Sequence, residues 1–237
     1  MKRGYINIHG RSIYTALVLP NSDIACEWCA LVLQPFGEEK RCSLRTVHRI
    51  CQRLADHGIP AMTFDYSGTG DSGGRHEDVL LSHWQEEATA AVHELKQLTS
   101  ATKLHLIALR SGALALGSLP CDKLTLAEPV FTGKEFLRDM ERRQLIKSFS
   151  GPQDTSQREF AGFLYSEAML QELSRAEVNP AFSSVTDETR IIHLTGGQTY
   201  PPSWKPYLPN ATATILRDRP FWGLTDYFES KLPDCFA

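Results

Sequence analysis

One strand-to-helix turn in this sequence has the form of a nucleophile site but lacks its central residue. The stretch LIALRSG, residues 106–112, ends an apolar run in a small-residue turn, and GALALGSL then begins a helix-like pattern. A turn of the form G-x-S-x-G at such a place presents a catalytic serine. Here Ala108 and Gly112 occupy the flanking small positions, and Arg110 lies between them. Ser111 follows the apex, where we expect its hydroxyl to cap the helix rather than attack a substrate.

The other members of a serine triad are missing from their expected places. A serine nucleophile needs a base and an acid, and after this kind of turn the chain order is serine, acid, histidine. The place of the acid reads GGQTYPP and holds no carboxylate, and the place of the histidine reads DRPFW. The last histidine, His193, lies inside a predicted strand rather than after the final one. The sequence therefore predicts no Ser-His-Asp triad.

An arginine at the apex places a permanent cation beside a helix N-terminus, whose dipole is also positive. Such a charge must be paired or solvated. Glu38 and Glu39 in the adjoining loop, and Glu128 after a strand, are the candidate partners. Because side chains alternate along an extended loop, we expect Arg110 to contact one of the two adjacent glutamates, and the other to face a helix or solvent. The pair either pins the loop or offers a guanidinium fork to a ligand's carboxylate, phosphate or uronate group.

A glycine-rich stretch, FDYSGTGDSGG at residues 64–74, follows another predicted strand. Glycines allow tight turns and positive φ angles that other residues resist. We expect this segment to shape a loop, with Asp65 capping backbone amides.

The elements that must position these residues alternate along the chain. A hairpin around Gly10 opens the sequence, and strands then alternate with helices, which predicts an α/β fold with a mostly parallel central sheet and helices on both faces. We expect a single domain over residues 1–237, with a small helical cap inserted at about 132–184. The expected strands cover residues 5–10, 12–20, 29–36, 61–67, 103–109, 123–130, 190–197 and 212–218, and the expected helices cover about 43–57, 81–98, 135–148, 166–178 and 222–232.

Composition narrows the class of protein. The chain has 237 residues, 42% hydrophobic and 22% charged, with a formal net charge of -3, so we expect neither a nucleic-acid partner nor a membrane-seeking surface. The N-terminal segment is a poor signal peptide, and no run of about 18 apolar residues predicts membrane insertion, so we expect a cytoplasmic protein. Of the six cysteines, Cys26 and Cys29 form a lone C-x-x-C, which favours separate reduced thiols over a redox pair. We expect no cofactor and no metal site.

Several motifs together resemble a known family. PFGEE at residues 35–39, the D-x-x-G-x-G-x-S pattern at 65–72, LRSGA at 109–113 and AEPVFTG at 127–133 are similar to motifs of the hydrolase-like proteins associated with bacterial exosortase and exopolysaccharide systems. The resemblance continues into EFAGFLYSEAMLQEL and RPFW, and departs from the family pattern at Gln34, Ala108 and Ala127. It implies an α/β-hydrolase fold and, by analogy of fold, hydrolysis.

Three functional hypotheses remain open at this stage. The first is a degenerate hydrolase that binds a small anionic or glycan-derived ligand, or that serves as an accessory protein in exopolysaccharide or exosortase systems. The second is an active hydrolase that uses Ser111 or a water activated by a glutamate. The third is a structural partner protein that forms a homo-oligomer. The candidate catalytic residues are Arg110, Ser111, Glu38 and Glu39, and the candidate ligand-binding residues are Phe36, Gly37, Glu128, Gln198 and Trp222.

Overall fold

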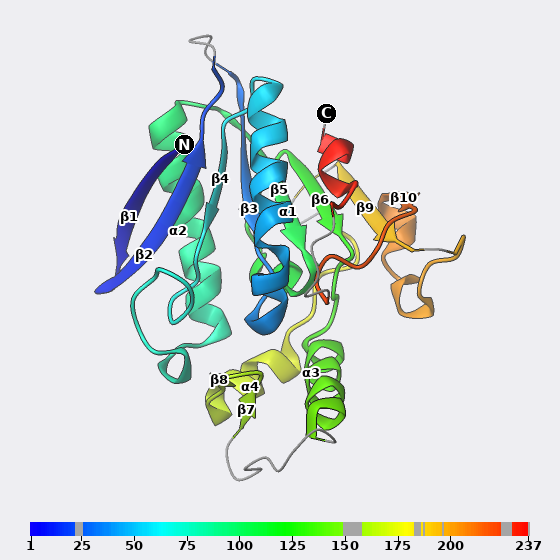
Figure 1. The fold of residues 1–237 in the computed structure, drawn as a ribbon. Coiled ribbons are helices and arrows are strands. Elements are labelled where there is room, and N and C mark those ends of the chain that lie inside the picture. Colours follow the sequence, from blue (N-terminus) through cyan, green and yellow to red (C-terminus); the bar gives the residue numbers. More distant parts are fainter. Residues whose placement is uncertain are drawn as a thin grey trace.

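The computed structural model describes residues 1–21, 26–148, 158–182, 186, 188–195, 197–223 and 229–236. Their main feature is an eight-stranded sheet in the order β1-β2-β4-β3-β5-β6-β9-β10 (Figure 1). β1 and β2 form an antiparallel hairpin, β2 is antiparallel to β4, and the remaining pairs are parallel. The mostly parallel sheet is therefore confirmed. The strands are β1 (Lys2–Ile8), β2 (Arg11–Val18), β3 (Trp28–Leu33), β4 (Ala61–Phe64), β5 (Lys103–Leu109), β6 (Lys123–Ala127), β9 (Thr189–Leu194) and β10 (Thr212–Leu216).

Two long helices cover opposite faces of the sheet, α1 (Gly37–Asp56) and α2 (Leu81–Thr99). In Figure 1, α1 lies in front of the sheet and α2 behind it. The strand residues alternate accordingly, because successive side chains point to opposite faces. Val32 packs with α1 in one apolar cluster, whereas Leu31 and Leu33 pack with α2 in the other.

The helix α1 begins six residues earlier than the predicted start at about residue 43. Phe36 is its N-cap in an extended conformation, and Glu38 and Glu39 lie in its first turn. Acidic side chains in a first turn are stabilised by the helix dipole. The two glutamates therefore lie on a helix and not on the extended loop that we expected, which changes the directions in which their side chains point.

The chain between β6 and β9 forms a group of elements at the carboxyl ends of the parallel strands. It contains α3 (Gly133–Ser148), the two-stranded sheet of β7 (Glu159–Phe160) and β8 (Phe163–Leu164), and α4 (Glu167–Arg175). Figure 1 shows α3 and α4 below the arrowheads of β5 and β6. Both helices expected in this part of the chain are present, while residues 149–157 and 183–185 lie outside the described residues.

Short 3₁₀ helices complete the chain: η1 (His76–Asp78), η2 (Arg110–Ala115), η3 (Pro202–Trp204), η4 (Leu208–Asn210) and η5 (Leu232–Phe236). The helix expected at 222–232 falls largely on residues 224–228, which lie outside the described residues. The six cysteines form no disulfide with one another. In the part of the chain that the structure describes, no helix is long and apolar enough to span a membrane.

Candidate functional site

Arg110 lies at the apex of a sharp strand-to-helix turn, as the sequence predicts. β5 ends at Leu109, and η2 begins at Arg110 with a φ of 50°. A positive φ is unusual for a residue with a side chain, and such strain is typical of functional turns. Gly112 explains why the turn needs small residues, because a Cβ there would lie 2.5 Å from the Leu33 carbonyl oxygen and 2.6 Å from that of Gln34. The turn is thus pressed against the carboxyl end of β3.

The Arg110 guanidinium is held by a buried carboxylate on α1. Its Nη2 lies 3.0 Å from Glu39 Oε1 and its Nε lies 3.3 Å from Glu39 Oε2, while Nη1 donates to the Glu128 carbonyl oxygen at 3.3 Å. The Trp222 ring stacks on the guanidinium, with 4.4 Å between its centroid and Arg110 Cζ. Arg110 is 8% exposed and Glu39 is 3% exposed. A two-pronged contact of this kind is the strongest form of ion pair that an arginine makes.

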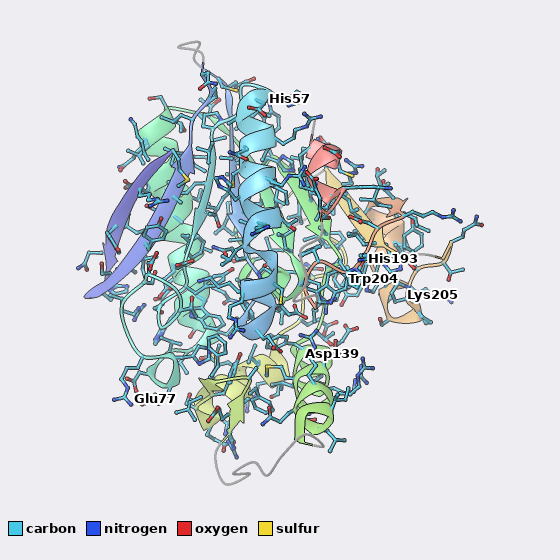
Figure 2. All side chains as sticks on the ribbon, in the orientation of Figure 1. His57, Glu77, Asp139, His193, Trp204 and Lys205 are labelled. Atoms are coloured by element: carbon cyan, nitrogen blue, oxygen red, sulfur yellow. The ribbon has the colours of Figure 1, made fainter. Side chains whose placement is uncertain are left out.

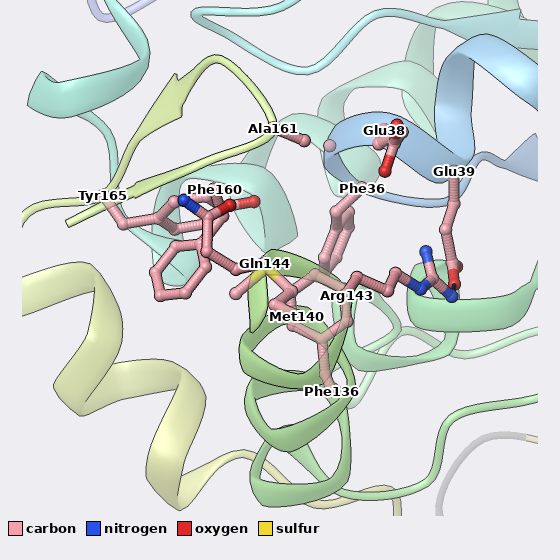
Figure 3. Close-up of a pocket in the computed structure, with 11 residues that line it drawn as sticks. Phe36, Glu38, Glu39, Phe136, Met140, Arg143, Gln144, Phe160, Ala161 and Tyr165 are labelled. Carbon is pink, nitrogen blue, oxygen red and sulfur yellow. Dashed lines mark hydrogen bonds and ion pairs between the residues drawn. The ribbon is translucent and has the colours of Figure 1, made fainter. Parts of the chain in front are cut away.

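A second arginine connects this pair to α3. Arg143 contacts Glu39 through its Nη2, and Figure 3 shows its side chain extending from α3 to the Glu39 carboxylate. Asp139 on the same helix lies 3.8 Å from Arg110 Nη2. The carboxylate of Glu39 therefore ties together α1, the turn after β5 and α3. We call Arg110, Glu39 and Arg143 the arginine–glutamate cluster.

A cavity of about 30 Å³ lies beside this cluster, between the first turn of α1 and α3 (Figure 3). This volume holds about two water molecules. Both Glu38 and Glu39 border this cavity, but only Glu39 contacts Arg110, as expected. Both can lie at the cavity because they are in the first helical turn and not on an extended loop. Its other borders are largely apolar and include Phe36, Gly37, Phe136, Met140, Phe160 and Tyr165.

The Tyr165 hydroxyl has no hydrogen-bond partner among the described residues, although the side chain is buried beside this cavity. Burial and the nearby Glu39 charge raise the pKa of the Tyr165 phenol well above its ordinary value. The phenol therefore keeps its proton and remains a hydrogen-bond donor at the cavity.

Ser111 is fully buried and does not cap the helix, which corrects the expected role. Its Oγ instead accepts a hydrogen bond of 2.8 Å from the Phe36 backbone N–H. The loop after β3 is the place from which a hydrolase of this kind supplies one oxyanion donor. In this chain the Phe36 amide is already used by a side chain.

The carboxylate of Glu128 pairs with a histidine and not with Arg110. Its Oε2 lies 2.8 Å from His193 Nδ1 and accepts the Leu194 N–H at 2.7 Å. His193 lies 4.8 Å from Trp204 between ring centroids, and Figure 2 shows the two side by side at the edge of the sheet. The sequence alone did not predict this pair, although it holds one signal for it. Glu128 directly follows β6, and His193 lies near the end of the neighbouring strand β9.

The remaining candidates separate into two groups. Phe36 and Gly37 border the cavity, whereas Trp222 contacts Arg110 without bordering it. Gln198 is exposed in a bend after β9 and does not border the cavity. The described residues contain no group of three or more His, Cys, Asp or Glu side chains placed to hold a metal ion.

Comparison with known proteins gives a clear answer at the level of the fold. No protein-family model and no curated protein sequence matches the chain. Among solved structures, it is similar to Est1E from Butyrivibrio proteoclasticus, with a TM-score of 0.65 and 17% identity over 90% of this chain and 88% of the other.

Two further solved structures are similar to the chain. XC6422 from Xanthomonas campestris, described as an α/β serine hydrolase without a lid, gives a TM-score of 0.58 and 15% identity over 91% of this chain and 83% of the other. The proline iminopeptidase of Mycobacterium smegmatis gives a TM-score of 0.60 and 12% identity over 90% of this chain and 89% of the other. Together with the sheet order and the turn after β5, these similarities show that the chain has the α/β-hydrolase fold.

Proposed function

We propose that this chain is a non-catalytic protein of the α/β-hydrolase fold that binds a small anionic ligand at the arginine–glutamate cluster. The observation that carries the proposal is the arginine in the place of the nucleophile. Arg110 cannot give up a proton in the working range of a protein, so it cannot act as a nucleophile or a base. The neighbouring Ser111 is fully buried, and its Oγ is bonded to the Phe36 amide.

The charge arrangement supports an anionic ligand. Arg110 and Arg143 both contact the carboxylate of Glu39, and Arg110 also lies 3.8 Å from Asp139. Arg143 is the more exposed of the two arginines, with 30% of its side chain open to solvent, whereas Arg110 has 10%. The carboxylate of a ligand, such as that of a uronate, would bind the Arg143 guanidinium, while the ion pair between Glu39 and Arg110 would remain. The cavity of about 30 Å³ is too small for such a ligand. Binding therefore requires that α3 shift, with residues 132–184 acting as a cap.

The wider role that we propose is that of a bacterial, cytoplasmic accessory protein in an exopolysaccharide or exosortase system. The resemblance of the PFGEE, LRSGA and AEPVFTG motifs to proteins of those systems supports this role. A uronate carries the carboxylate that an arginine fork binds, and it is therefore the probe of the cluster.

Calorimetric titration with glucuronate tests the ligand class. We expect glucuronate to bind and glucose not to bind, because only glucuronate carries the carboxylate. The substitution Arg143→Met should weaken glucuronate binding at least tenfold, which corresponds to about 1.4 kcal/mol. Arg142→Met, on the exposed face of the same helix, is the matched control and should leave binding unchanged. Equal binding of glucuronate by both variants, or none by the wild type, would contradict the proposal.

A second candidate function is hydrolysis by a water that His193 activates. The specific observation is the contact of 2.8 Å between His193 Nδ1 and Glu128 Oε2. Because a carboxylate only accepts hydrogen bonds, this contact places the ring proton on Nδ1 and leaves Nε2 as a base in the neutral ring. Such a base can take a proton from water as the oxygen attacks an ester carbonyl.

An ester-hydrolysis assay separates the two functions. If the second holds, wild-type protein turns over small esters, and His193→Asn abolishes the turnover, whereas the exposed control His93→Asn on α2 does not. We expect no turnover by either variant or by the wild type, in agreement with the first proposal.

A further inference from the structure

A second and larger cavity, of about 510 Å³, lies on the other side of the first turn of α1. Small-molecule sites have volumes of roughly 300–1,000 Å³, so this one is of the right size. Strands β2 and β4 and the helix α1 form its walls, and the loop after β4 closes one end. In Figure 1, β2 and β4 lie to the left of α1. Gly37 borders both cavities, but no member of the arginine–glutamate cluster borders this one.

One end of the cavity is apolar. Ala16 and Val18 lie on the face of β2 that is turned toward α1, whereas Ile13 and Leu17 on its other face belong to the core that includes α2. From α1 the cavity receives Leu44, Val47 and Cys51. Leu44 is 49% exposed, which places it at the mouth of the cavity.

The other end holds a buried acceptor that has no donor. Gln34 is 2% exposed, and its Nε2 donates to the Phe64 carbonyl oxygen at 2.7 Å and to Asp65 Oδ1 at 3.3 Å. A flipped amide would set oxygen against oxygen, so this orientation is fixed by its partners. Gln34 Oε1 is then without a hydrogen-bond partner among the described residues. A buried polar atom in this state is rare in folded proteins and calls for an explanation.

The same end of the cavity holds a buried cation, Lys40, whose charge is balanced by Asp65. Lys40 Nζ is 2.7 Å from Asp65 Oδ1 and donates to Thr69 Oγ1 at 3.0 Å. An ammonium group has three donors, so these two contacts leave one for a ligand. Because Asp65 balances the charge of Lys40, the buried end has no uncompensated charge to receive an anion. Asp65 also accepts the Asp71 N–H at 2.8 Å, which confirms the predicted capping of loop amides.

We propose that this cavity binds an uncharged amphipathic molecule, an aliphatic chain that ends in a hydroxyl. A hydroxyl both donates and accepts, so one group satisfies both polar partners. It donates to Gln34 Oε1 and accepts from Lys40 Nζ, while the chain lies between β2 and α1 against Ala16 and Val47. This inference does not depend on the proposed function, because the two sites differ in their residues and in the charge of the ligand.

Titration of the full-length protein with 1-octanol and with octanoate, followed by calorimetry or ligand-observed NMR, tests the proposal. We expect saturable binding of 1-octanol at one site and at least tenfold weaker binding of octanoate. Ala16→Leu fills the apolar end and should weaken 1-octanol binding at least tenfold. Ala90→Leu, on α2 at the other face of the sheet, is the matched control and should bind like the wild type. Should Ala16→Leu fail to fold, Val18→Phe is the second variant. It fills the same apolar end of the cavity from the last residue of β2 and should weaken 1-octanol binding in the same way.

The polar end has its own variant. Gln34→Met keeps a side chain of similar length without the acceptor, and should remove the preference for 1-octanol over octanoate. The proposal is overturned if 1-octanol shows no saturable binding, if octanoate binds as tightly as 1-octanol, or if a cavity-filling variant binds 1-octanol like the wild type.

Discussion

The Ser111 hydroxyl accepts a hydrogen bond from the Phe36 backbone N–H at 2.8 Å, and this contact joins the turn after β5 to the loop after β3. In an active serine hydrolase, amides from these two segments face the substrate as oxyanion donors. Here the serine side chain fills the space between them and uses one donor. The hydroxyl that most resembles a nucleophile in the sequence therefore has a structural role.

Removal of that hydroxyl should destabilise the fold without affecting any reaction. Ser111→Ala leaves the buried Phe36 N–H without an acceptor, which costs about 1–3 kcal/mol of unfolding free energy. Chemical unfolding measures the loss. Ser174→Ala on α4, where the hydroxyl donates to the Gln171 carbonyl oxygen, is the control and should change stability by less than about 0.5 kcal/mol. Equal losses in the two variants would show that the Ser111 contact contributes nothing particular.

The same hydroxyl should not react with a fluorophosphonate probe. Ser111 is fully buried, and no base contacts its Oγ in the described structure. We expect no covalent label on the wild type by mass spectrometry. A label on Ser111 that Ser111→Ala abolishes would show that the turn opens to present a working serine.

Gly112 should tolerate no side chain. A Cβ there would lie 2.5 Å and 2.6 Å from two backbone oxygens of the segment that ends β3, and backbone cannot move aside easily. Gly112→Ala should therefore cost about 1–3 kcal/mol or more of unfolding free energy. Gly223→Ala is the control, because a Cβ at residue 223 meets no atom within 4 Å. A Gly112→Ala protein as stable as the control would show that the turn is not pressed against β3.

Two features of the site follow from local sequence, and the structure confirms both. The turn at Arg110 follows from an apolar strand, small flanking residues and a helix-like pattern within one short stretch. The need for a carboxylate follows from the cost of burying a cation, and Glu39 supplies it. The choice between the two glutamates was not predictable, because it depends on where α1 begins.

The features that were missed depend on contacts between distant segments. The pairing of Glu128 with His193 requires that β6 and β9 be neighbours in the sheet, because the partners are 65 positions apart in the sequence. The contact of Ser111 with Phe36 requires that the turn after β5 pack on β3, across 75 residues. No periodicity or motif in the sequence fixes such neighbours without the strand order.

His105 should make the protein less stable as the pH falls. It lies in β5 with its Nε2 2.8 Å from Thr125 Oγ1, and burial, assisted by the charges of Lys123 and Arg190, lowers its pKa from 6.5 to about 3. Below pH 6.5 His105 binds a proton in the unfolded chain, whereas in the folded protein it stays neutral down to about pH 3. The unfolding free energy should therefore fall by about 1.4 kcal/mol per pH unit through this window because of His105.

Unfolding of His105→Gln by denaturant at several pH values isolates this contribution from that of the carboxylates. The variant should show a shallower loss of stability between pH 6 and pH 4 than the wild type, by about 1 kcal/mol per pH unit. The control His93→Gln removes an exposed histidine and should reproduce the slope of the wild type. Identical slopes for His105→Gln and the wild type would mean that His105 is not buried in its neutral form.

The central claim is that the place of the nucleophile holds one end of a buried ion pair between Arg110 and Glu39, and a double-mutant cycle tests it most directly. Glu39→Gln removes the two-pronged partner of the buried guanidinium and should cost about 3–5 kcal/mol of unfolding free energy. Arg110→Met leaves the carboxylate with Arg143 alone and should also be destabilising. The double variant should cost less than the sum of the two by at least about 1 kcal/mol, because residues in contact are coupled. Losses that add to within about 0.5 kcal/mol would contradict the ion pair and the account built on it.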